Sequence, residues 1–124
     1  MCRQEVACGV LYNSQGKILM GLRTSDSEDG GFWEFPGGKR EQDETIQHCL
    51  QREWKEELNL TIYIDREIYS CTMGDKYMCR FFIGKILDEE KIKRNVHEKI
   101  VFVDKTEMAT LNMFQSDKQL LNII

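Results

Sequence analysis

Three glutamates stand at i, i+3 and i+4 in the middle of the chain: Glu53, Glu56 and Glu57. On a helix, like charges at these spacings repel one another by about 0.2–0.5 kcal/mol per pair. A divalent cation removes that repulsion, and a set of carboxylate oxygens suits Mg²⁺, with Mn²⁺ as a substitute. Arg52 precedes Glu56 by about one helical turn, so it can pair with that carboxylate and orient it. The cluster therefore predicts a divalent-metal site.

The helix that carries these glutamates is expected from Glu44 to Leu58. Its apolar residues recur at every fourth position: Ile46, Leu50, Trp54 and Leu58, with Cys49 beside them. This stripe faces the core, and Asp43 stands where an N-cap belongs, with acidic residues near the first turn suiting the helix dipole. At about 100° per residue, Glu53 and Glu57 project onto the edge of the stripe, and Glu56 is expected just beside them, near Cys49. A solvated acidic face is the alternative interpretation, but it fits poorly because burying an unpaired carboxylate costs several kcal/mol.

Two glycines, Gly37 and Gly38, follow Phe35-Pro36 and precede this helix. Glycine adopts backbone conformations closed to other residues. The pair can therefore let a main-chain carbonyl or amide approach a metal or a phosphate. A Gly-Gly pair after proline is usually only a turn, so its position shortly before the glutamates is what favours a site.

Strands and short helices are predicted around the acidic helix. β-Branched and aromatic residues indicate strands at 5–12, 17–22, 61–71, 77–86 and 99–103, with a short apolar piece at 32–35. Turn residues at 13–16 and 73–76 predict two hairpins, with loops at 24–31 and 88–94 and short helices at 106–111 and 117–123. These elements predict one α+β domain over residues 1–124, with a mixed β-sheet.

The composition argues against several classes of protein. A chain of 124 residues suits one domain, and 41% hydrophobic with 31% charged residues is ordinary for a soluble globular protein. The net charge of −4 argues against a broad basic surface for nucleic acid. We expect no signal peptide and no membrane span. Reduced thiols in a cytoplasmic protein are expected from the widely spaced cysteines: Cys2, Cys8, Cys49, Cys71 and Cys79.

The intervals between the charged residues resemble the Nudix box. The pattern runs Gly38, five residues, Glu44, seven residues, Arg52-Glu53, two residues and Glu56-Glu57. The family has glycine where this chain has Asn59, but asparagine is the next most tolerant residue at a left-handed helix end, so we expect the loop to survive. The resemblance implies a Nudix-type α/β/α sandwich around the mixed sheet.

The resemblance extends outside the box. The lead-in Glu34-Phe35-Pro36-Gly37-Gly38-Lys39 looks like that of MutT-like nucleoside triphosphate pyrophosphohydrolases. His97-Glu98 resembles a later segment whose glutamate reaches the metals, with Phe102 where that subgroup usually has tryptophan. Ser116-Asp117 resembles the pair that reads the base edge.

What the resemblance implies is Mg²⁺-dependent hydrolysis of a modified or oxidised nucleoside triphosphate to a monophosphate and pyrophosphate, in sanitisation of the nucleotide pool. The implied metal ligands are the Gly37 carbonyl and four carboxylates: Glu53, Glu56, Glu57 and Glu98. Glu53 is also the expected general base, supported by Arg52 and Glu44. Substrate contacts are expected from Arg23, Phe35, Gly38, Lys39 and Asp117, of which Arg23 and Lys39 are candidate phosphate ligands. The expected partner is a small nucleotide, and the chain acts as a monomer or homodimer.

The base is less well defined by the sequence. An ionised Asp117 only accepts hydrogen bonds, so it favours an exocyclic amine such as that of cytosine, whereas asparagine could also donate to O6 of an oxidised guanine. We therefore expect a cytosine nucleotide or 8-oxo-dGTP. Asp117 could instead be the N-cap of the last helix. Phe35, Tyr77 and Phe81 could stack on the base or belong to the core.

Two other functions stay open at this point. Removal of pyrophosphate from RNA 5′ ends would need a basic path for the strand, and the acidic balance of the chain speaks against it. A catalytically silent nucleotide-binding module should lack some of the metal carboxylates, whereas this chain keeps them all.

Overall fold

The computed structural model describes residues 3–124 and contains one mixed β-sheet with helices on both faces. The strands are β1 (Gln4–Tyr12), β2 (Ile18–Leu22), β3 (Trp33–Glu34), β4 (Gly37–Lys39), β5 (Ile62–Met73), β6 (Tyr77–Ile86) and β7 (Lys99–Val103). The helices are α1 (Ile46–Leu58), α2 (Lys105–Met108) and α3 (Gln115–Lys118), with 3-10 turns η1 (Glu89–Lys91) and η2 (Gln119–Asn122). The predicted α+β class with a mixed sheet is confirmed. Cys2 lies outside the described residues.

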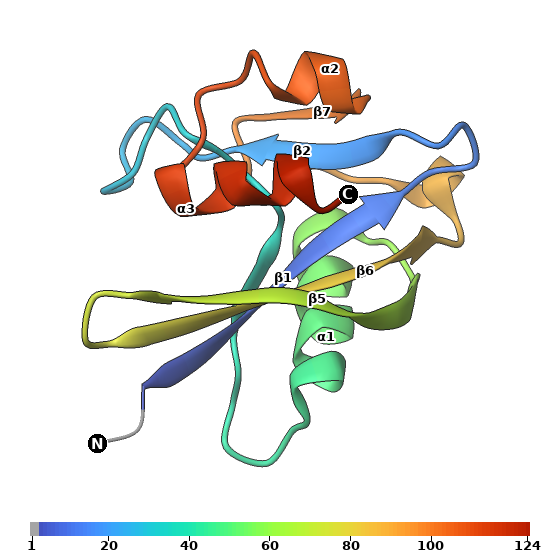
Figure 1. Ribbon diagram of the computed structural model, residues 1–124. Helices are drawn as coiled ribbons and strands as arrows, with labels where there is room; N and C mark the ends of the chain where they lie inside the picture. The colour runs from blue at the N-terminus through green and yellow to red at the C-terminus, as the bar shows by residue number, and fades with distance from the viewer. Residues whose placement is uncertain (1–2) are drawn as a thin grey trace.

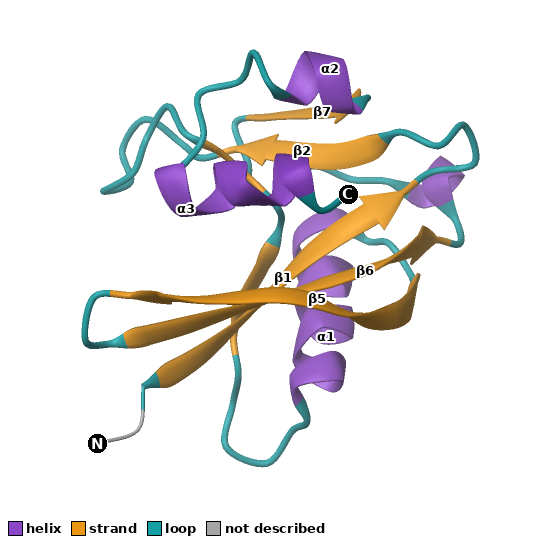
Figure 2. Ribbon diagram, viewed as in Figure 1, coloured by secondary structure: helices purple, strands orange, loops and turns teal. Residues whose placement is uncertain are grey.

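The sheet has the order β3-β2-β1-β6-β5, with β4 paired to β1 and β7 paired to β2. Among the described strands, β1 and β6 run parallel and the other pairs are antiparallel. Both predicted hairpins are present, although β1 and β2 pair only where Tyr12 faces Ile18. Figure 1 shows α1 against β1, β5 and β6, and Figure 2 shows α2 and α3 beside β2 and β7. No helix within residues 3–124 is long and apolar enough to span a bilayer.

Each face of the sheet has its own hydrophobic core. The predicted stripe of α1 is buried in the first core, where Trp54 is 0% exposed. Its indole Nε1 donates to the Pro36 carbonyl oxygen at 2.8 Å, which joins α1 to the segment that leads into β4. The second core packs β1, β6 and β7 against α2 and η2, through side chains such as Phe81 and Leu120. The site is therefore framed by α1 on one face and by the C-terminal helices on the other.

The ends of α1 correct one prediction and confirm another. Thr45, and not Asp43, is the N-cap, because its Oγ1 accepts the His48 amide at 3.1 Å. The helix begins at Ile46 and has no acidic residue in its first turn, so the expected dipole contact there is wrong. Asn59 has φ 57° and ψ 34° at the other end, which confirms the left-handed conformation expected for it.

The connector between β6 and β7 is attached to the last turn of α1. The Lys93 amide donates to the Leu58 carbonyl at 2.9 Å, and the Asn95 amide donates to the Glu57 carbonyl at 3.1 Å. Asn95 Nδ2 also donates to the Glu56 carbonyl at 3.0 Å. Carbonyls at the end of a helix lack partners within the helix. The connector supplies these partners and holds the start of β7 beside the glutamates.

Candidate metal and nucleotide site

The three glutamates of α1 differ in exposure. The side chains of Glu53 and Glu57 are 17% and 13% exposed, whereas that of Glu56 is 57% exposed. Glu53 and Glu57 therefore lie at the edge of the apolar face, as expected. Glu56 faces solvent, so the expectation that it lies beside them on that edge is wrong. Burial, followed by the charges of Glu34 and Glu53, raises the pKa of Glu57 to about 9. Burial likewise raises the pKa of Glu53.

Arg52 connects the helix to the loop before it. Its Nε and Nη2 donate to the two carboxylate oxygens of Glu44 at 3.0 and 2.7 Å. This bidentate pair lowers the pKa of Glu44 to about 2. Nη1 also contacts Glu56 at 3.2 Å and Glu53 at 3.5 Å. Arg52 thus orients several carboxylates together, and it donates to the Lys39 carbonyl at 3.3 Å.

Gly37 and Gly38 are needed for space and not for an unusual backbone. Both form β4, and positive φ angles occur at other glycines, such as Gly74. A Cβ at Gly38 would lie 2.0 Å from Oε2 of Glu53, and a Cβ at Gly37 would lie 1.7 Å from the Ala7 carbonyl oxygen. The expectation that the pair adopts conformations closed to other residues is therefore wrong. The missing side chain of Gly38 lets Glu53 lie against the backbone of β4.

A second group of polar side chains meets Glu57 from β3 and from the segment just before β7. Ligand atoms of Glu34, Glu57 and His97 all lie within 4.8 Å of one another. His97 Nε2 is 2.7 Å from Oε2 of Glu34 and 3.8 Å from Oε1 of Glu57. Glu34 and His97 belong to motifs that resemble those of the Nudix family, but neither was expected to be a metal ligand. Their proximity depends on strand pairing between distant segments, which no local pattern shows.

Glu98 is not in this group. Its side chain is exposed, and Oε1 accepts the Ser25 amide at 3.2 Å. The structure therefore brings Glu53 and Glu57 together on α1, whereas the Glu98 carboxylate, just before β7, is bonded to the loop that contains Ser25.

Arg23 and Lys39, the two candidate phosphate ligands, lie in different surroundings. Arg23 Nη1 pairs with Oε1 of Glu34 at 2.8 Å, while its Nε is buried and has no hydrogen-bond partner among the described residues. That unpaired donor suits an acceptor on a ligand. The Lys39 ammonium lies 5.4 Å from the ring centroid of Tyr77, the first residue of β6. Arg23 is thus next to the carboxylate group, and Lys39 is next to an aromatic ring.

Asp117 lies inside α3 and is 7% exposed. The N-cap of that helix is Phe114, so the alternative interpretation of Asp117 as an N-cap is wrong. Burial and the charge of Glu34 raise the pKa of Asp117 to about 6.

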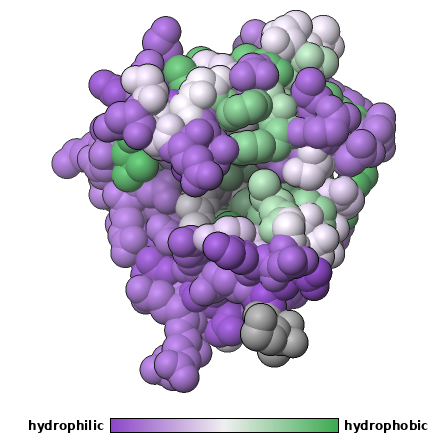
Figure 3. All heavy atoms as spheres, turned by 90° about the vertical axis from the view of Figure 1, so that its left-hand side faces the viewer, coloured by the Kyte–Doolittle hydropathy of each residue, from purple (hydrophilic) through white to green (hydrophobic). Residues whose placement is uncertain are grey.

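Phe35 and Phe81 pack edge to face in the second core, with ring centroids 6.0 Å apart. Figure 3 shows the side of the molecule that faces left in Figure 1, where the surface is hollowed between hydrophilic rims and hydrophobic side chains gather around the hollow.

The fold and the site define a protein of one family. Residues 3–122 match the NUDIX domain, so the chain belongs to the Nudix family.

Several named proteins are similar to this chain. It is 37% identical over 71 residues to 8-oxo-dGTP diphosphatase of Proteus vulgaris, across 57% of this chain and 58% of that protein. It is 38% identical over 66 residues to CTP pyrophosphohydrolase of Escherichia coli K12, across 53% of this chain and 48% of that protein. The matches span about half the length of these relatives. The solution structure of the E. coli ORF135 protein superposes with a TM-score of 0.80 at 26% identity, covering 99% of this chain and 89% of that one.

Proposed function

We propose that this chain is a metal-dependent pyrophosphohydrolase, which cleaves a modified or oxidised nucleoside triphosphate to a monophosphate and pyrophosphate. The observation that carries the proposal is the excess of partly buried carboxylate around Glu57. Its neighbours Glu34 and Glu53 both raise its pKa. Buried carboxylates without a cation are costly, and a bound divalent ion would neutralise them.

The residues present fit such an ion. Oxygen donors of Glu53, Glu56, Glu57 and the Gly37 carbonyl would hold Mg²⁺, which binds few protein ligands and bridges to substrate phosphates. Bound metal supplies charge neutralisation at the phosphates and positions the attacking water. For Glu98 to join this set, its carboxylate would have to leave the Ser25 amide that it accepts at 3.2 Å.

The protein groups then have separate tasks in the proposed reaction. Glu53 takes the proton of the attacking water, because its pKa is raised by burial and it is close to the metal ligands. Arg52, fixed by Glu44, keeps that carboxylate in place. The unpaired Nε of Arg23 donates to a phosphate oxygen. The absence of a side chain at Gly38 leaves room for the Glu53 carboxylate beside β4.

We propose that the nucleobase of the substrate binds on the side of the sheet that carries Asp117. A carboxyl group whose pKa is about 6 is partly protonated near neutral pH, and the neutral form both donates and accepts hydrogen bonds. This supports 8-oxo-dGTP as well as a cytosine nucleotide, the two substrate classes that the names of the relatives contain. We place the enzyme in the cytoplasm, acting on free nucleotides as a monomer or homodimer.

The test is product analysis over a panel of nucleoside triphosphates, including 8-oxo-dGTP and 5-substituted dCTP, with Mg²⁺ and with Mn²⁺. Pyrophosphate and a monophosphate are the expected products. Activity on triphosphorylated RNA alone would replace the proposal with RNA 5′-end hydrolysis. Binding of nucleotides without any turnover would indicate a silent module.

A further inference from the structure

His97 and Glu98 are consecutive residues, yet their side chains lie in different surroundings. The His97 side chain is 1% exposed, and its Nε2 faces the carboxylates of Glu34 and Glu57 at 2.7 and 3.8 Å. The Glu98 side chain is exposed and bonds the Ser25 amide. This segment therefore presents a nitrogen ligand, and not a carboxylate, to the metal-binding helix.

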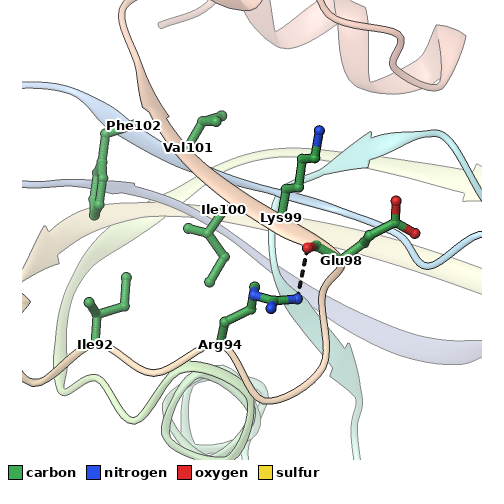
Figure 4. A pocket seen from close by; sticks show the side chains of 7 residues that line it. All are labelled: Ile92, Arg94, Glu98, Lys99, Ile100, Val101 and Phe102. Carbon is green, nitrogen blue, oxygen red and sulfur yellow. Dashed lines mark hydrogen bonds between the residues drawn. The ribbon is translucent and has the colours of Figure 1, made fainter.

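Arg94 fixes that orientation through the backbone. Its Nη1 donates to the carbonyl of His97 at 2.9 Å and to the carbonyl of Glu98 at 2.7 Å. The Glu98 amide donates to the Leu22 carbonyl at 2.9 Å, which begins the pairing of β7 with β2. Figure 4 shows the Arg94 guanidinium reaching the Glu98 backbone, while the Glu98 carboxylate points away from Arg94. Turning this backbone segment over, so that Glu98 faced the helix in place of His97, would break these hydrogen bonds.

The imidazole also fills a space that β2 leaves open. A Cβ at Gly21 would lie 2.5 Å from Cδ2 of His97. Gly21 pairs with Glu34 across β2 and β3, so the ring lies over the strand at the position where Glu34 is held. Nδ1 of His97 is buried and has no partner among the described residues. Nε2 is thus the paired nitrogen, and it is directed at the two carboxylates.

One imidazole nitrogen and two carboxylate oxygens are a different ligand set from the oxygen-only set expected from the sequence. Mg²⁺ takes oxygen ligands, whereas imidazole suits first-row transition metals. The three ligand atoms lie within 4.8 Å of one another, so one ion can contact all three after small side-chain movements.

We propose that Glu34, Glu57 and His97 form a mixed nitrogen–oxygen site for a divalent first-row transition metal, and that His97 makes this chain bind such a metal in preference to Mg²⁺. The inference rests on the proposed function to the extent that Glu57 belongs to both ligand sets. It adds a ligand and a metal preference that the Nudix box does not contain.

The first experiment measures the affinities for Co²⁺ and Mg²⁺ by calorimetry, in the wild type, in His97→Gln and in His48→Gln. The chain has two histidines, and His48 is exposed on α1, so its variant is the matched control. His97→Gln should weaken Co²⁺ binding by about tenfold or more and leave Mg²⁺ binding unchanged. Equal Co²⁺ affinities in the two variants would overturn the proposal.

The second experiment needs no variant, so it also decides the matter if His97→Gln does not fold. Pulsed electron paramagnetic resonance of Co²⁺ bound to the wild type should show coupling to a nitrogen nucleus. A spectrum without nitrogen coupling, together with normal triphosphate hydrolysis, would overturn this inference and leave the proposed function intact. Nitrogen coupling without any hydrolysis of triphosphates would support this inference and overturn the proposed function.

Discussion

Glu57 has the environment that depends most on a bound cation. It contacts His97, lies beside Glu53 and is nearly buried, so it belongs to both proposed ligand sets. We expect Glu57→Gln to abolish turnover while the protein still folds, because the amide keeps the volume and removes the charge that binds the ion. Steady-state hydrolysis of the best triphosphate, with circular dichroism for folding, checks this. A fully active variant would show that the metal assignment is wrong.

The same residue should make the metal-free protein sensitive to pH. Its pKa is about 9 in the folded state, whereas the unfolded chain releases the proton near the ordinary value of about 4.3. The group's favourable contribution to stability is therefore complete below the unfolded pKa and is lost as the pH rises through the folded pKa. With EDTA present, the Tm of the wild type should fall more between these limits than that of Glu57→Gln. Parallel Tm curves would contradict the raised pKa.

Asp117 should make the base preference depend on pH. Because its pKa is about 6, the carboxyl donates a hydrogen bond below that pH and only accepts above it. The ratio of kcat/KM for 8-oxo-dGTP to that for dCTP should therefore fall as the pH rises through about 6. Taking the ratio cancels titration at the metal site. Asp117→Asn should remove the dependence, and a ratio that is flat in the wild type would exclude Asp117 from the base contact.

At the scale of the element, α1 is the structure on which the site depends. Its N-cap is Thr45, so Thr45→Ala should cost about 1 kcal/mol of stability. Asp43→Ala is the matched control, because Asp43 precedes the helix without capping it. Urea denaturation of both variants measures the difference. If the Asp43 variant lost more stability than the Thr45 variant, the cap assignment would be reversed.

The elements also show which parts of the site could be predicted. The buried stripe, the placement of Glu53 and Glu57 and the left-handed Asn59 follow from the helical period and from local backbone preferences. The N-cap could not be placed, because Asp43 and Thr45 are both acceptable capping residues within two positions of each other. Sequence motifs located His97-Glu98 but not their orientations, since a shift of one residue in an extended segment exchanges the two faces.

At the scale of the whole molecule, pairing between strands far apart in the sequence brings site residues together, and local sequence patterns do not predict this pairing. Glu34, Glu57 and His97 come from β3, α1 and the segment just before β7. They meet because β2 pairs with both β3 and β7. Asp117 is buried by the packing of the C-terminal helices and not by its own sequence neighbours.

A hydrogen bond from Trp54 joins α1 to the segment before β4 and should contribute to the free energy of unfolding of the whole domain. Trp54 Nε1 donates to the Pro36 carbonyl at 2.8 Å inside the core. Trp54→Phe removes this bond, while the Pro36 carbonyl still accepts the Gly9 amide at 3.0 Å. The loss of the bond should therefore cost about 0.5–1.5 kcal/mol in urea denaturation. Trp33→Phe is the comparison, since this indole is only half-buried and makes no side-chain hydrogen bond among the described residues. A smaller loss in Trp54→Phe than in Trp33→Phe would contradict the role of this bond.

The connector between β6 and β7, which is attached to the last turn of α1, changes the surroundings of the negative pole of the helix dipole. Glu56 and Glu57 stand at the end that carries the negative pole of the helix dipole, where carboxylates are disfavoured by about 0.3–1 kcal/mol each. The amides of Lys93 and Asn95 bond the carbonyls there in place of water, so this pole is partly shielded from solvent. A divalent ion beside Glu57 would be attracted by the peptide dipoles as well as by the side chains. Ligation and folding are then thermodynamically linked, and metal at about a hundred times its Kd should add about 2.7 kcal/mol to the free energy of unfolding.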